Sequence, residues 1–304
     1  MKLKHVIESQ QFSREDLDFL FQTANRMEKV SQEEKELKNK ILITLFYEPS
    51  TRTRLSFEAA MIKLGGSVIS TENAASFSSA AKGETLEDTI RVLSGYGDVI
   101  VIRHYETGAA LKASLVSEIP IINAGDGTGQ HPTQALLDLY TINKELGRID
   151  GISVAMVGDL YNGRTVRSLS YLLAKYKDIR LYFVAPPNVK MKDDIKEYLA
   201  RHKVKFEETE NLEDVAPKVD VIYQTRIQRE RFTTMEEYEK TKGIYIIDKK
   251  IMKILSKNAI IMHPLPRVDE IKYEVDSDPR AAYFRQAHNG LYIRMALLSI
   301  VLES

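Results

Sequence analysis

The sequence predicts an α/β protein built from two doubly wound parallel-sheet domains. Three observations support this fold class. Short apolar runs rich in Ile, Leu and Val alternate with segments of helical period along the chain, which is typical of parallel strands joined by helices. The chain has 304 residues, which is long for a single hydrophobic core. The alternation also restarts near the midpoint, where a helix over 132–147 is followed by a strand over 152–157.

Composition limits the partners and cofactors. Lys plus Arg and Asp plus Glu both number 43, so no excess charge favours nucleic acid or an anionic membrane as a partner. No apolar run approaches the roughly 20 residues of a membrane span, and the first residues lead into no signal-like apolar core. We therefore expect a cytoplasmic protein. Cys is absent, which excludes disulfides, thiolate metal ligands and thiol catalysis, and we expect neither a metal nor a cofactor.

Periodicity predicts the elements of the first half in order. Ser13 is placed to cap a helix over 14–29. The remaining helices and strands expected in this half follow the same two patterns. The strands are 41–46, 67–70, 98–102 and 119–123, and the helices are 55–64, 84–94 and 107–117.

The second half repeats the alternation. A charged stretch over 228–243 lacks apolar spacing, which indicates a surface excursion able to move. Beyond the strand and helix already named at the midpoint, strands are expected at 181–184, 219–223 and 259–262, and helices at 191–202 and 286–302.

The run Phe46-Tyr47-Glu48-Pro49-Ser50-Thr51-Arg52-Thr53-Arg54 joins the first expected strand to its helix. Pro49 keeps Glu48 extended, so the chain turns before the helix begins. The unpaired N–H groups of the first helical turn, two hydroxyls and Arg52 would form a cationic site for phosphate. Alternatively, Ser50 or Thr51 only caps the helix, and the arginines lie on a solvated face.

Polar residues at two further strand ends are candidates for the same site. Arg103 ends a nearly all-apolar strand, at the edge where open α/β sheets bind ligands. Its neighbour His104 could be a site residue, but it could as easily be a satisfied surface or core histidine, so Arg103 alone is predicted to belong to the site. His131 follows a Gly-rich loop and precedes Pro132, so the helix dipole disfavours its protonation, and a neutral imidazole can donate to a carbonyl oxygen. A capping His without chemistry is the alternative, which Gln134 one turn later makes less attractive.

The second half offers a site for a different anion. Arg164 opens a helix, and Arg226 and Gln228 emerge on the same side of the chain after a strand. Two arginines at strand ends of one sheet match a dicarboxylate, because guanidinium binds carboxylate through two parallel hydrogen bonds. A solvated charge run is the alternative, and it describes residues 229–231 better than Arg226.

Two further loops carry backbone signals. Residues 158–163 have the spacing Gly-x-x-x-x-Gly, which lacks the dinucleotide fingerprint and argues against a nicotinamide cofactor. Pro264 and Pro266 fix the chain after the last strand. The carbonyl groups of Leu265 and Pro266 can therefore be aimed rigidly at an amide NH2 group.

The nonapeptide 46–54 resembles the carbamoyl-phosphate motif of the aspartate/ornithine transcarbamoylase family, and the resemblance covers nearly the whole chain. Five separated motifs in family order are more specific than any one of them. Besides the nonapeptide and its continuation to Glu58, the motifs that resemble the aspartate branch are Gln130-His131-Pro132-Thr133-Gln134, Gly158-Asp159-Leu160 with Gly163-Arg164-Thr165, Thr225-Arg226-Ile227-Gln228, and His263-Pro264-Leu265-Pro266-Arg267.

The resemblance implies carbamoyl transfer from carbamoyl phosphate to the α-amino group of L-aspartate, a step of pyrimidine biosynthesis, with the active site between the two domains. It implies a carbamoyl-phosphate domain over 1–131, completed by 286–304, and an aspartate domain over 132–285. It also implies a homotrimer with shared active sites and allows for a separate regulatory chain. The catalytic residues implied are Arg52, Thr53, Arg103 and His131, and the substrate-binding residues are Ser50, Thr51, Ser78, Lys82, Gln134, Arg164, Arg226, Gln228, Leu265 and Pro266.

In the family, the residues that correspond to Ser78 and Lys82 reach into the neighbouring subunit's site. Ala81 stands here where some relatives carry a second Lys, so this site has one cation fewer.

Two alternative functions compete with this one. An ornithine carbamoyltransferase would share the first domain, but Arg226 is wrong for a cationic amino acid, and that relative typically carries Cys at the position of Leu265. A non-catalytic α/β protein that senses phosphate or a nucleotide is the alternative from another class.

Overall fold

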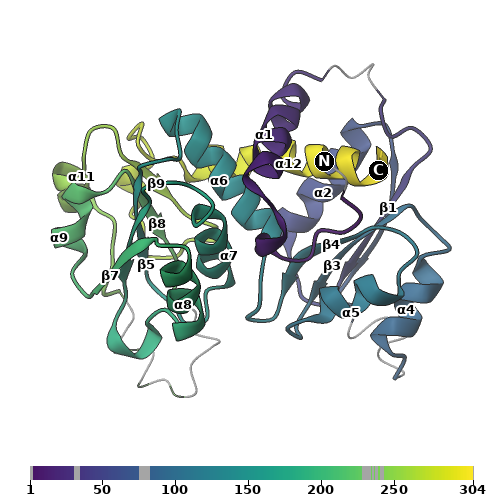
Figure 1. The fold of residues 1–304 in the computed structure, drawn as a ribbon, viewed down its shortest axis with the longest axis horizontal. Coiled ribbons are helices and arrows are strands. Elements are labelled where there is room, and N and C mark those ends of the chain that lie inside the picture. Colours follow the sequence, from purple (N-terminus) through teal and green to yellow (C-terminus); the bar gives the residue numbers. More distant parts are fainter. Residues whose placement is uncertain are drawn as a thin grey trace. The chain divides into compact units, whose positions relative to one another are not determined.

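The computed structural model describes residues 3–30, 35–74, 83–227, 234, 236, 239 and 243–303. The chain divides into two compact units (Figure 1). The first comprises Met1–Leu137 and His288–Ser304, and the second comprises Asp138–Ala287. Both units contain a parallel β-sheet with helices, which confirms the predicted fold class.

The first unit is built on a four-stranded parallel sheet in the order β2-β1-β3-β4. Its strands are β1 (Ile41–Phe46), β2 (Ser67–Glu72), β3 (Val99–His104) and β4 (Ile121–Asp126). The runs of β1, β3 and β4 are almost entirely buried, whereas the edge strand β2 is largely exposed. Because all strands are parallel, the carboxyl ends of β1, β3 and β4 lie next to one another at one edge of the sheet.

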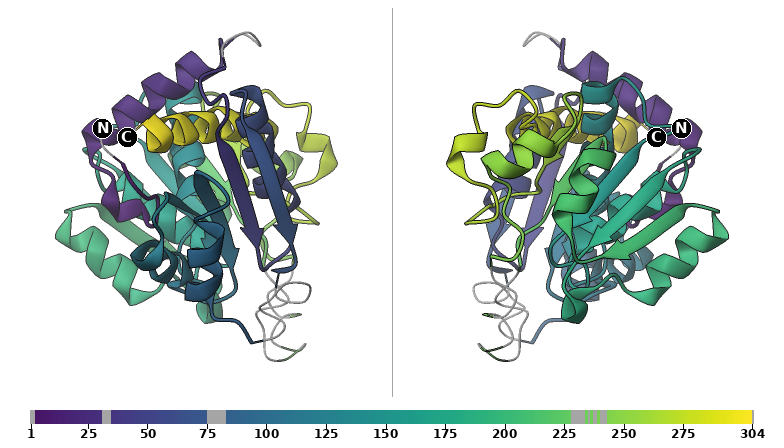
Figure 2. Two further views of the ribbon diagram at one scale, coloured as in Figure 1. Left: turned by 90° about the vertical axis from the view of Figure 1, so that its right-hand side faces the viewer. Right: turned by 90° about the vertical axis from the view of Figure 1, so that its left-hand side faces the viewer.

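Helices surround this sheet. They are α1 (Arg14–Met27), α2 (Thr51–Lys63), α4 (Leu86–Leu93) and α5 (Ala109–Val116), and α4 and α5 lie side by side in Figures 1 and 2. The predicted cap of α1 is confirmed, because Ser13 Oγ accepts from the Asp16 amide at 3.2 Å. The end of α12 (Tyr283–Glu303) belongs to this unit, where Ser299 Oγ donates to Glu36 at 3.0 Å.

The second unit is built on a five-stranded parallel sheet in the order β7-β6-β5-β8-β9. The strands are β5 (Ser153–Val157), β6 (Arg180–Val184), β7 (Lys205–Thr209), β8 (Val221–Gln224) and β9 (Ile260–Met262). Apolar residues of β5, β6, β8 and β9 form the core of this unit together with side chains from its helices. The helices are α6 (Pro132–Leu146), which starts in the first unit, α7 (Arg164–Leu173), α8 (Asp193–Arg201), α9 (Leu212–Val215) and α11 (Lys249–Ile254).

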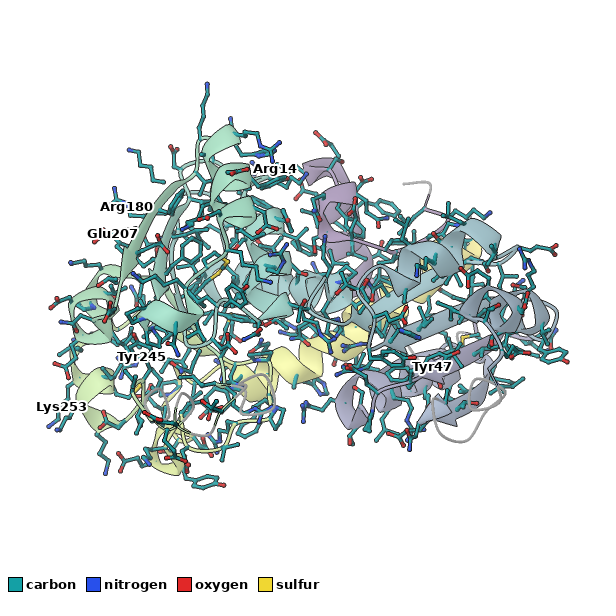
Figure 3. All side chains as sticks on the ribbon, turned by 90° about the horizontal axis from the view of Figure 1, so that it is seen from below. Arg14, Tyr47, Arg180, Glu207, Tyr245 and Lys253 are labelled. Atoms are coloured by element: carbon teal, nitrogen blue, oxygen red, sulfur yellow. The ribbon has the colours of Figure 1, made fainter. Side chains whose placement is uncertain are left out.

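Among the described elements that the sequence did not predict are α11 and the strand β7. The strand is the more informative case. It reads Lys-Phe-Glu-Glu-Thr and is mostly exposed at the edge of the sheet. Figure 3 labels Glu207 on this strand beside Arg180 on β6. An edge strand needs few apolar residues, so hydrophobic pattern alone does not reveal it. None of the described helices is long and apolar enough to cross a membrane.

Candidate active site

The helices α2 and α7 begin with a charge that the positive end of a helix dipole disfavours, as do α11 and α12, but α2 and α7 each follow the carboxyl end of a sheet strand directly. The helices α1, α4, α8 and α9 carry two acidic residues each in the first turn, which suits the positive end of a helix dipole. By contrast, α2 and α7 have no acidic residue there. They carry Arg52 and Arg164 instead. A cation at this end of a helix is unfavourable until an anion binds, so both positions are suited to anion recognition.

The start of α2 lies directly after β1. Ser50 occupies the N-cap position, but its side chain makes no capping hydrogen bond. Ser50 therefore takes the N-cap position that the sequence offered to Ser50 or Thr51, but without a side-chain capping bond. Ser50 Oγ instead accepts from Arg103 Nη1 at 3.4 Å, so the hydroxyl faces the neighbouring strand end. The amide N–H groups of the first turn of α2 are consequently not occupied by this side chain.

The other residues of this helix start differ in exposure. Thr51 and Arg52 are exposed, and Thr53 is buried. Neighbouring protein atoms partly desolvate the Arg52 guanidinium, which lowers its pKa below the usual range. Lowering the pKa means that the protein disfavours the charged form. A bound anion would offset this cost.

Arg103 lies beside this helix start in space. It is paired with Phe46 in the register of β3 and β1, and its carbonyl oxygen accepts from the Tyr47 amide at 2.8 Å. Its Nε lies 3.3 Å from Glu48 Oε2. The sheet therefore brings Arg103 and Ser50 together, although 53 residues separate them in the chain.

The neighbouring His104 has a structural environment. It is buried, its ring stacks on Tyr105, and its Nδ1 accepts from the Glu106 amide at 3.0 Å. Tyr47, which is labelled in Figure 3, contacts the same ring. Burial lowers the pKa of His104. Of its two sequence interpretations, that of a satisfied core histidine is correct.

His131 and Gln134 follow β4. Both side chains are buried, and the Gln134 amide donates to the His131 carbonyl at 3.1 Å. The loop before His131 is held by Asp126, whose two carboxylate oxygens accept from the Gly108 amide at 2.8 Å and the Gln130 amide at 2.9 Å. His131 therefore ends a fixed loop at the carboxyl edge of the first sheet.

The second unit presents Arg164 and Arg226 after β5 and β8, which are adjacent strands. Both side chains are partly buried. Thr225 is fixed to β5, because its amide N–H and its hydroxyl both donate to the Val157 carbonyl at 2.8 Å. Gly158 allows this close approach: its φ is +115°, and a Cβ there would lie 2.5 Å from the Thr225 carbonyl oxygen. Thr225, the residue directly before Arg226, is thus fixed to the strand pair β5 and β8.

Leu265 and Pro266 follow β9 at the edge of the same sheet. Leu265 has φ +51°, a left-handed conformation that is unusual for a non-glycine residue, and its peptide bond to Pro266 is cis. The Leu265 amide donates to Nδ1 of His263 at 2.7 Å. The sequence analysis gave His263 no role, although it belongs to one of the family motifs. The signal that could have identified it is its position two residues before Leu265, from which its ring can accept a hydrogen bond from the Leu265 amide.

Ser78, Lys82 and Gln228 lie outside the described residues. Each unit groups its own candidates at the carboxyl edge of its sheet. In the first unit these are Ser50, Thr51, Arg52, Thr53, Arg103, His131 and Gln134, and in the second they are Arg164, Arg226, Leu265 and Pro266. Within the described ranges, no group of three or more His, Asp or Glu residues is arranged to hold a metal ion.

Comparison with known proteins gives two family matches. Residues 4–144 match "Aspartate/ornithine carbamoyltransferase, carbamoyl-P binding domain", and residues 150–301 match "Aspartate/ornithine carbamoyltransferase, Asp/Orn binding domain". The chloroplastic aspartate carbamoyltransferase of Arabidopsis thaliana is 63% identical over 99% of this chain and 78% of the relative. The aspartate carbamoyltransferase catalytic subunit of Methanocaldococcus jannaschii is 52% identical over 99% of this chain and 98% of its own length.

Solved structures agree with these relatives. The M. jannaschii catalytic subunit superposes with a TM-score of 0.92 at 52% identity, covering 99% of this chain and 98% of that one. Aspartate transcarbamoylase from Trypanosoma cruzi, in complex with carbamoyl phosphate and aspartate, gives a TM-score of 0.92 at 44% identity, covering 99% and 97%.

One expectation from the sequence is overturned by these comparisons. Relatives from Arabidopsis thaliana, Pisum sativum and Oryza sativa, at 61–63% identity, are all named chloroplastic. The expected cytoplasmic location is therefore wrong. The inference failed because a lack of bulk charge and of a secretory signal does not distinguish between internal compartments.

Proposed function

The chain belongs to the aspartate/ornithine carbamoyltransferase family, and from this membership we infer that it transfers the carbamoyl group of carbamoyl phosphate to L-aspartate. The products are N-carbamoyl-L-aspartate and phosphate, in a step of pyrimidine biosynthesis. The observation that carries this function is one arginine in each unit at the start of a helix that has no acidic residue in its first turn and follows a strand directly: Arg52 of α2 after β1, and Arg164 of α7 after β5. One suits a phosphate and the other a carboxylate. The names of the plant relatives also support a plastid location.

We propose that phosphate binds at the start of α2. Arg52, Thr51, Thr53 and Ser50 hold its oxygens, with the N–H groups of the first helical turn. Cations and amide dipoles at this point stabilise the charge that accumulates on phosphate as it leaves. The desolvated Arg52 guanidinium supports this role, because the lowered pKa favours an anionic partner.

The carbonyl oxygen of the carbamoyl group then lies against Thr53, Arg103 and His131, which donate hydrogen bonds as negative charge grows on it. The contact between Arg103 and Ser50 supports this arrangement, because it brings the β3 end to the phosphate loop. The carbamoyl NH2 group donates to the side-chain carbonyl of Gln134 and to the main-chain carbonyls of Leu265 and Pro266.

We assign aspartate to the second unit. Arg164, Arg226 and Gln228 bind its two carboxylates. We keep the domain division expected from the sequence as part of this proposal: 1–131 with 286–304 holds the phosphate and the carbonyl oxygen of carbamoyl phosphate, and 132–285 binds aspartate and supplies the acceptors for the carbamoyl NH2 group. No protein base is assigned to the aspartate amine, and the departing phosphate takes the proton. Catalysis then rests mainly on positioning and electrostatics.

We further propose a homotrimer in which Ser78 and Lys82 complete the neighbouring subunit's site. Three large apolar side chains support self-association of the first unit, because they are exposed on one helix and the edge strand next to it. Leu55 and Ile62 on α2 are 49% and 62% exposed, and Ile69 on β2 is 46% exposed. When each subunit contributes one surface to its neighbour and receives a different surface from the next, the assembly can close as a ring, of which a trimer is an example.

Hybrid trimers test the shared site. Lys82→Ala and Arg52→Ala homotrimers should both be nearly inactive. Co-refolding them should create some sites that join an intact Arg52 to an intact Lys82, and these sites should regain full activity. No recovery in verified hybrids would remove Lys82 from the neighbour's site. Sizing of the protein from its native source would reveal the trimer and any separate regulatory chain.

The function itself is tested by incubating the protein with carbamoyl phosphate and either L-aspartate or L-ornithine. We expect N-carbamoyl-L-aspartate from the first mixture and no citrulline from the second, because two arginines match a dicarboxylate and repel a cation. Product from ornithine alone would establish the other branch of the family. No product in either mixture would favour a phosphate-sensing protein.

A further inference from the structure

His263 is the first residue after β9, and its backbone is fixed by a buried hydrogen-bond chain in the second unit. The His263 amide donates to Gln286 Oε1 at 2.8 Å, and Gln286 Nε2 donates to Asp138 Oδ1 at 2.6 Å. Tyr223, on the strand that leads to Arg226, donates to the other oxygen of Asp138 at 2.6 Å. All four residues are buried. These hydrogen bonds therefore connect the end of β9 to α12, α6 and β8.

The imidazole ring of His263 is fixed as well. Its Nδ1 accepts from the Leu265 amide at 2.7 Å, so this nitrogen carries no proton. The proton must then be on Nε2, which lies 2.8 Å from Glu270 Oε1 and donates to it. The other oxygen of Glu270 accepts from the amides of Val268 and Asp269 at 3.1 Å. Glu270 thus fixes both the tautomer and the position of the ring.

The charge state of Glu270 agrees with this arrangement. Burial by itself would raise the pKa of the carboxyl group, but the hydrogen bond from His263 and its neighbouring amides lower that pKa overall. An ionised Glu270 can only accept hydrogen bonds, so it requires a proton on the imidazole nitrogen that faces it.

Leu265 is the residue that needs such support. Its φ of +51° lies in the left-handed region, where the Cβ of a non-glycine residue crowds the backbone. The bond from its amide to His263 holds this conformation. The conformation in turn sets the direction in which the Leu265 carbonyl and the following Pro266 carbonyl point.

We propose that His263 is a positioning residue for the reaction, and that Glu270 holds it in the required tautomer. Neither side chain needs to touch substrate. Together they aim the Leu265 and Pro266 carbonyls at the carbamoyl NH2 group. This inference rests on the proposed function, which gives these two carbonyls their ligand.

A role in packing alone predicts a different result. If His263 only filled space in the core, its substitution would lower the stability of the protein and would lower the affinity for all ligands to a similar extent. The positioning role affects only ligands that carry the NH2 group. Inorganic phosphate lacks that group, and its proposed contacts at residues 50–53 belong to the other unit. Comparing carbamoyl phosphate with inorganic phosphate therefore separates the two roles.

The experiment uses the full-length protein and measures the binding of both ligands by calorimetry, with thermal unfolding as the check on folding. His263→Ala should lower the affinity for carbamoyl phosphate by roughly tenfold, which corresponds to one lost hydrogen bond. The affinity for inorganic phosphate should not change. His263→Asn should restore most of the affinity, because an Asn side-chain oxygen accepts from the amide two residues later.

Glu270→Gln provides a second variant that leaves the core filled. If the amide carbonyl of Gln keeps the Val268 and Asp269 contacts, its NH2 group faces Nε2 of His263. The imidazole proton must then move to Nδ1, which can no longer accept from Leu265. We expect the same selective loss of carbamoyl phosphate as in His263→Ala. In the His263→Asn background, Glu270→Gln should have no further effect, because Asn has no tautomer to set.

Equal weakening of both ligands, or no recovery in His263→Asn, would overturn the positioning role. So would an unchanged affinity for carbamoyl phosphate in a folded His263→Ala protein. Wild-type protein that binds carbamoyl phosphate but transfers it to no amino acid would contradict the proposed function instead, and the selective loss would still be measurable.

Discussion

The two units hold their candidate residues in different ways. In the first unit, Ser50 to Thr53 and His131 lie within a few residues of a strand end and a helix start, and contacts along the sheet bring them to Arg103. In the second unit, the backbone at Leu265 is fixed by His263, which depends on residues 138, 223, 270 and 286. The first arrangement follows from local chain direction, and the second requires partners from three distant segments as well as Glu270, seven residues along the chain.

This difference has a mechanistic counterpart. A helix start presents N–H groups and a dipole whatever the details of its surroundings, and so it binds phosphate robustly. Main-chain carbonyls can recognise an NH2 group only if the chain is held in one conformation. We therefore expect substitutions in the first unit to remove charge stabilisation, and substitutions in the second to disturb geometry or substrate choice.

The largest effect is expected at the start of α2. Arg52→Ala should cost roughly 2–5 kcal/mol of transition-state stabilisation, the range for removing one partner of a desolvated charge pair. Because Arg52 is exposed, thermal stability should be nearly unchanged. Measured kcat/KM tests this, with Lys63→Ala at the exposed far end of the same helix as the control. Near-wild-type turnover in Arg52→Ala would exclude the phosphate assignment.

A smaller and more selective effect is expected in the second unit. Arg226→Gln should raise KM for aspartate by roughly 10- to 150-fold, which is the loss of one charged hydrogen-bonding partner. Affinity for carbamoyl phosphate should change little. Arg180→Gln serves as the control, because Arg180 is exposed on the same sheet at the start of β6. An equal loss for both substrates would contradict the division of substrates between units.

The buried chain in the second unit gives a prediction about stability. Asp138→Asn removes one of the two acceptor oxygens, so either Gln286 Nε2 faces the new NH2 group or the Tyr223 hydroxyl must accept from it and loses the acceptor for its own proton. We expect the free energy of unfolding to fall by about 1–3 kcal/mol, the cost of one buried unsatisfied group. Asp193→Asn is the matched control, because its carboxylate is exposed and pairs only locally with Lys196. Chemical denaturation measures the free energy of unfolding of both variants. Equal values would mean that the hydrogen bonds of Asp138 do not stabilise the second unit.

Acidification should produce the smallest effect, and it should affect the units in sequence. Burial lowers the pKa of His104 in the first unit. The unfolded chain therefore binds a proton first, and stability falls as pH drops below about 6.5. In the second unit, hydrogen bonds from Arg267 and Arg280 lower the pKa of Asp276 and Asp278. That contribution is present above the unfolded pKa and is lost only below about pH 4.

Hydrogen exchange of each unit, corrected for the intrinsic rate at each pH, distinguishes these windows. Protection in β1 and β3 should begin to fall before protection in β5 and β8. The His104→Gln variant should reduce the early phase, and the remainder belongs to His5, whose pKa burial also lowers. Simultaneous loss of protection in both units would show that His104 does not control the first.

The same contrast explains how far the sequence could be interpreted. Buried strands such as β1 and β3 were predicted because their runs are almost entirely apolar, with Thr44 the one polar residue within β1. Arg103 was identified by its position at a strand end. Ser50 was offered as an N-cap and occupies that position, but the sequence did not reveal that its hydroxyl makes no capping bond and faces an arginine 53 residues away. The strand β7 was missed because it lies at a sheet edge. His263 was given no role because its ring contacts with Glu270 and the Leu265 amide, which fix its tautomer, depend on the folded loop and cannot be read from the sequence.

Equilibrium binding of carbamoyl phosphate, without aspartate, tests the central claim that Arg52 of the first unit anchors carbamoyl phosphate, whereas Arg226 of the second unit serves aspartate alone. Calorimetry on the wild type, Arg52→Ala and Arg226→Gln is sufficient. We predict that the wild type and Arg226→Gln bind carbamoyl phosphate with the same affinity, whereas Arg52→Ala binds it weakly or not at all. Loss of binding in a folded Arg226→Gln protein, or full binding in Arg52→Ala, would contradict the account.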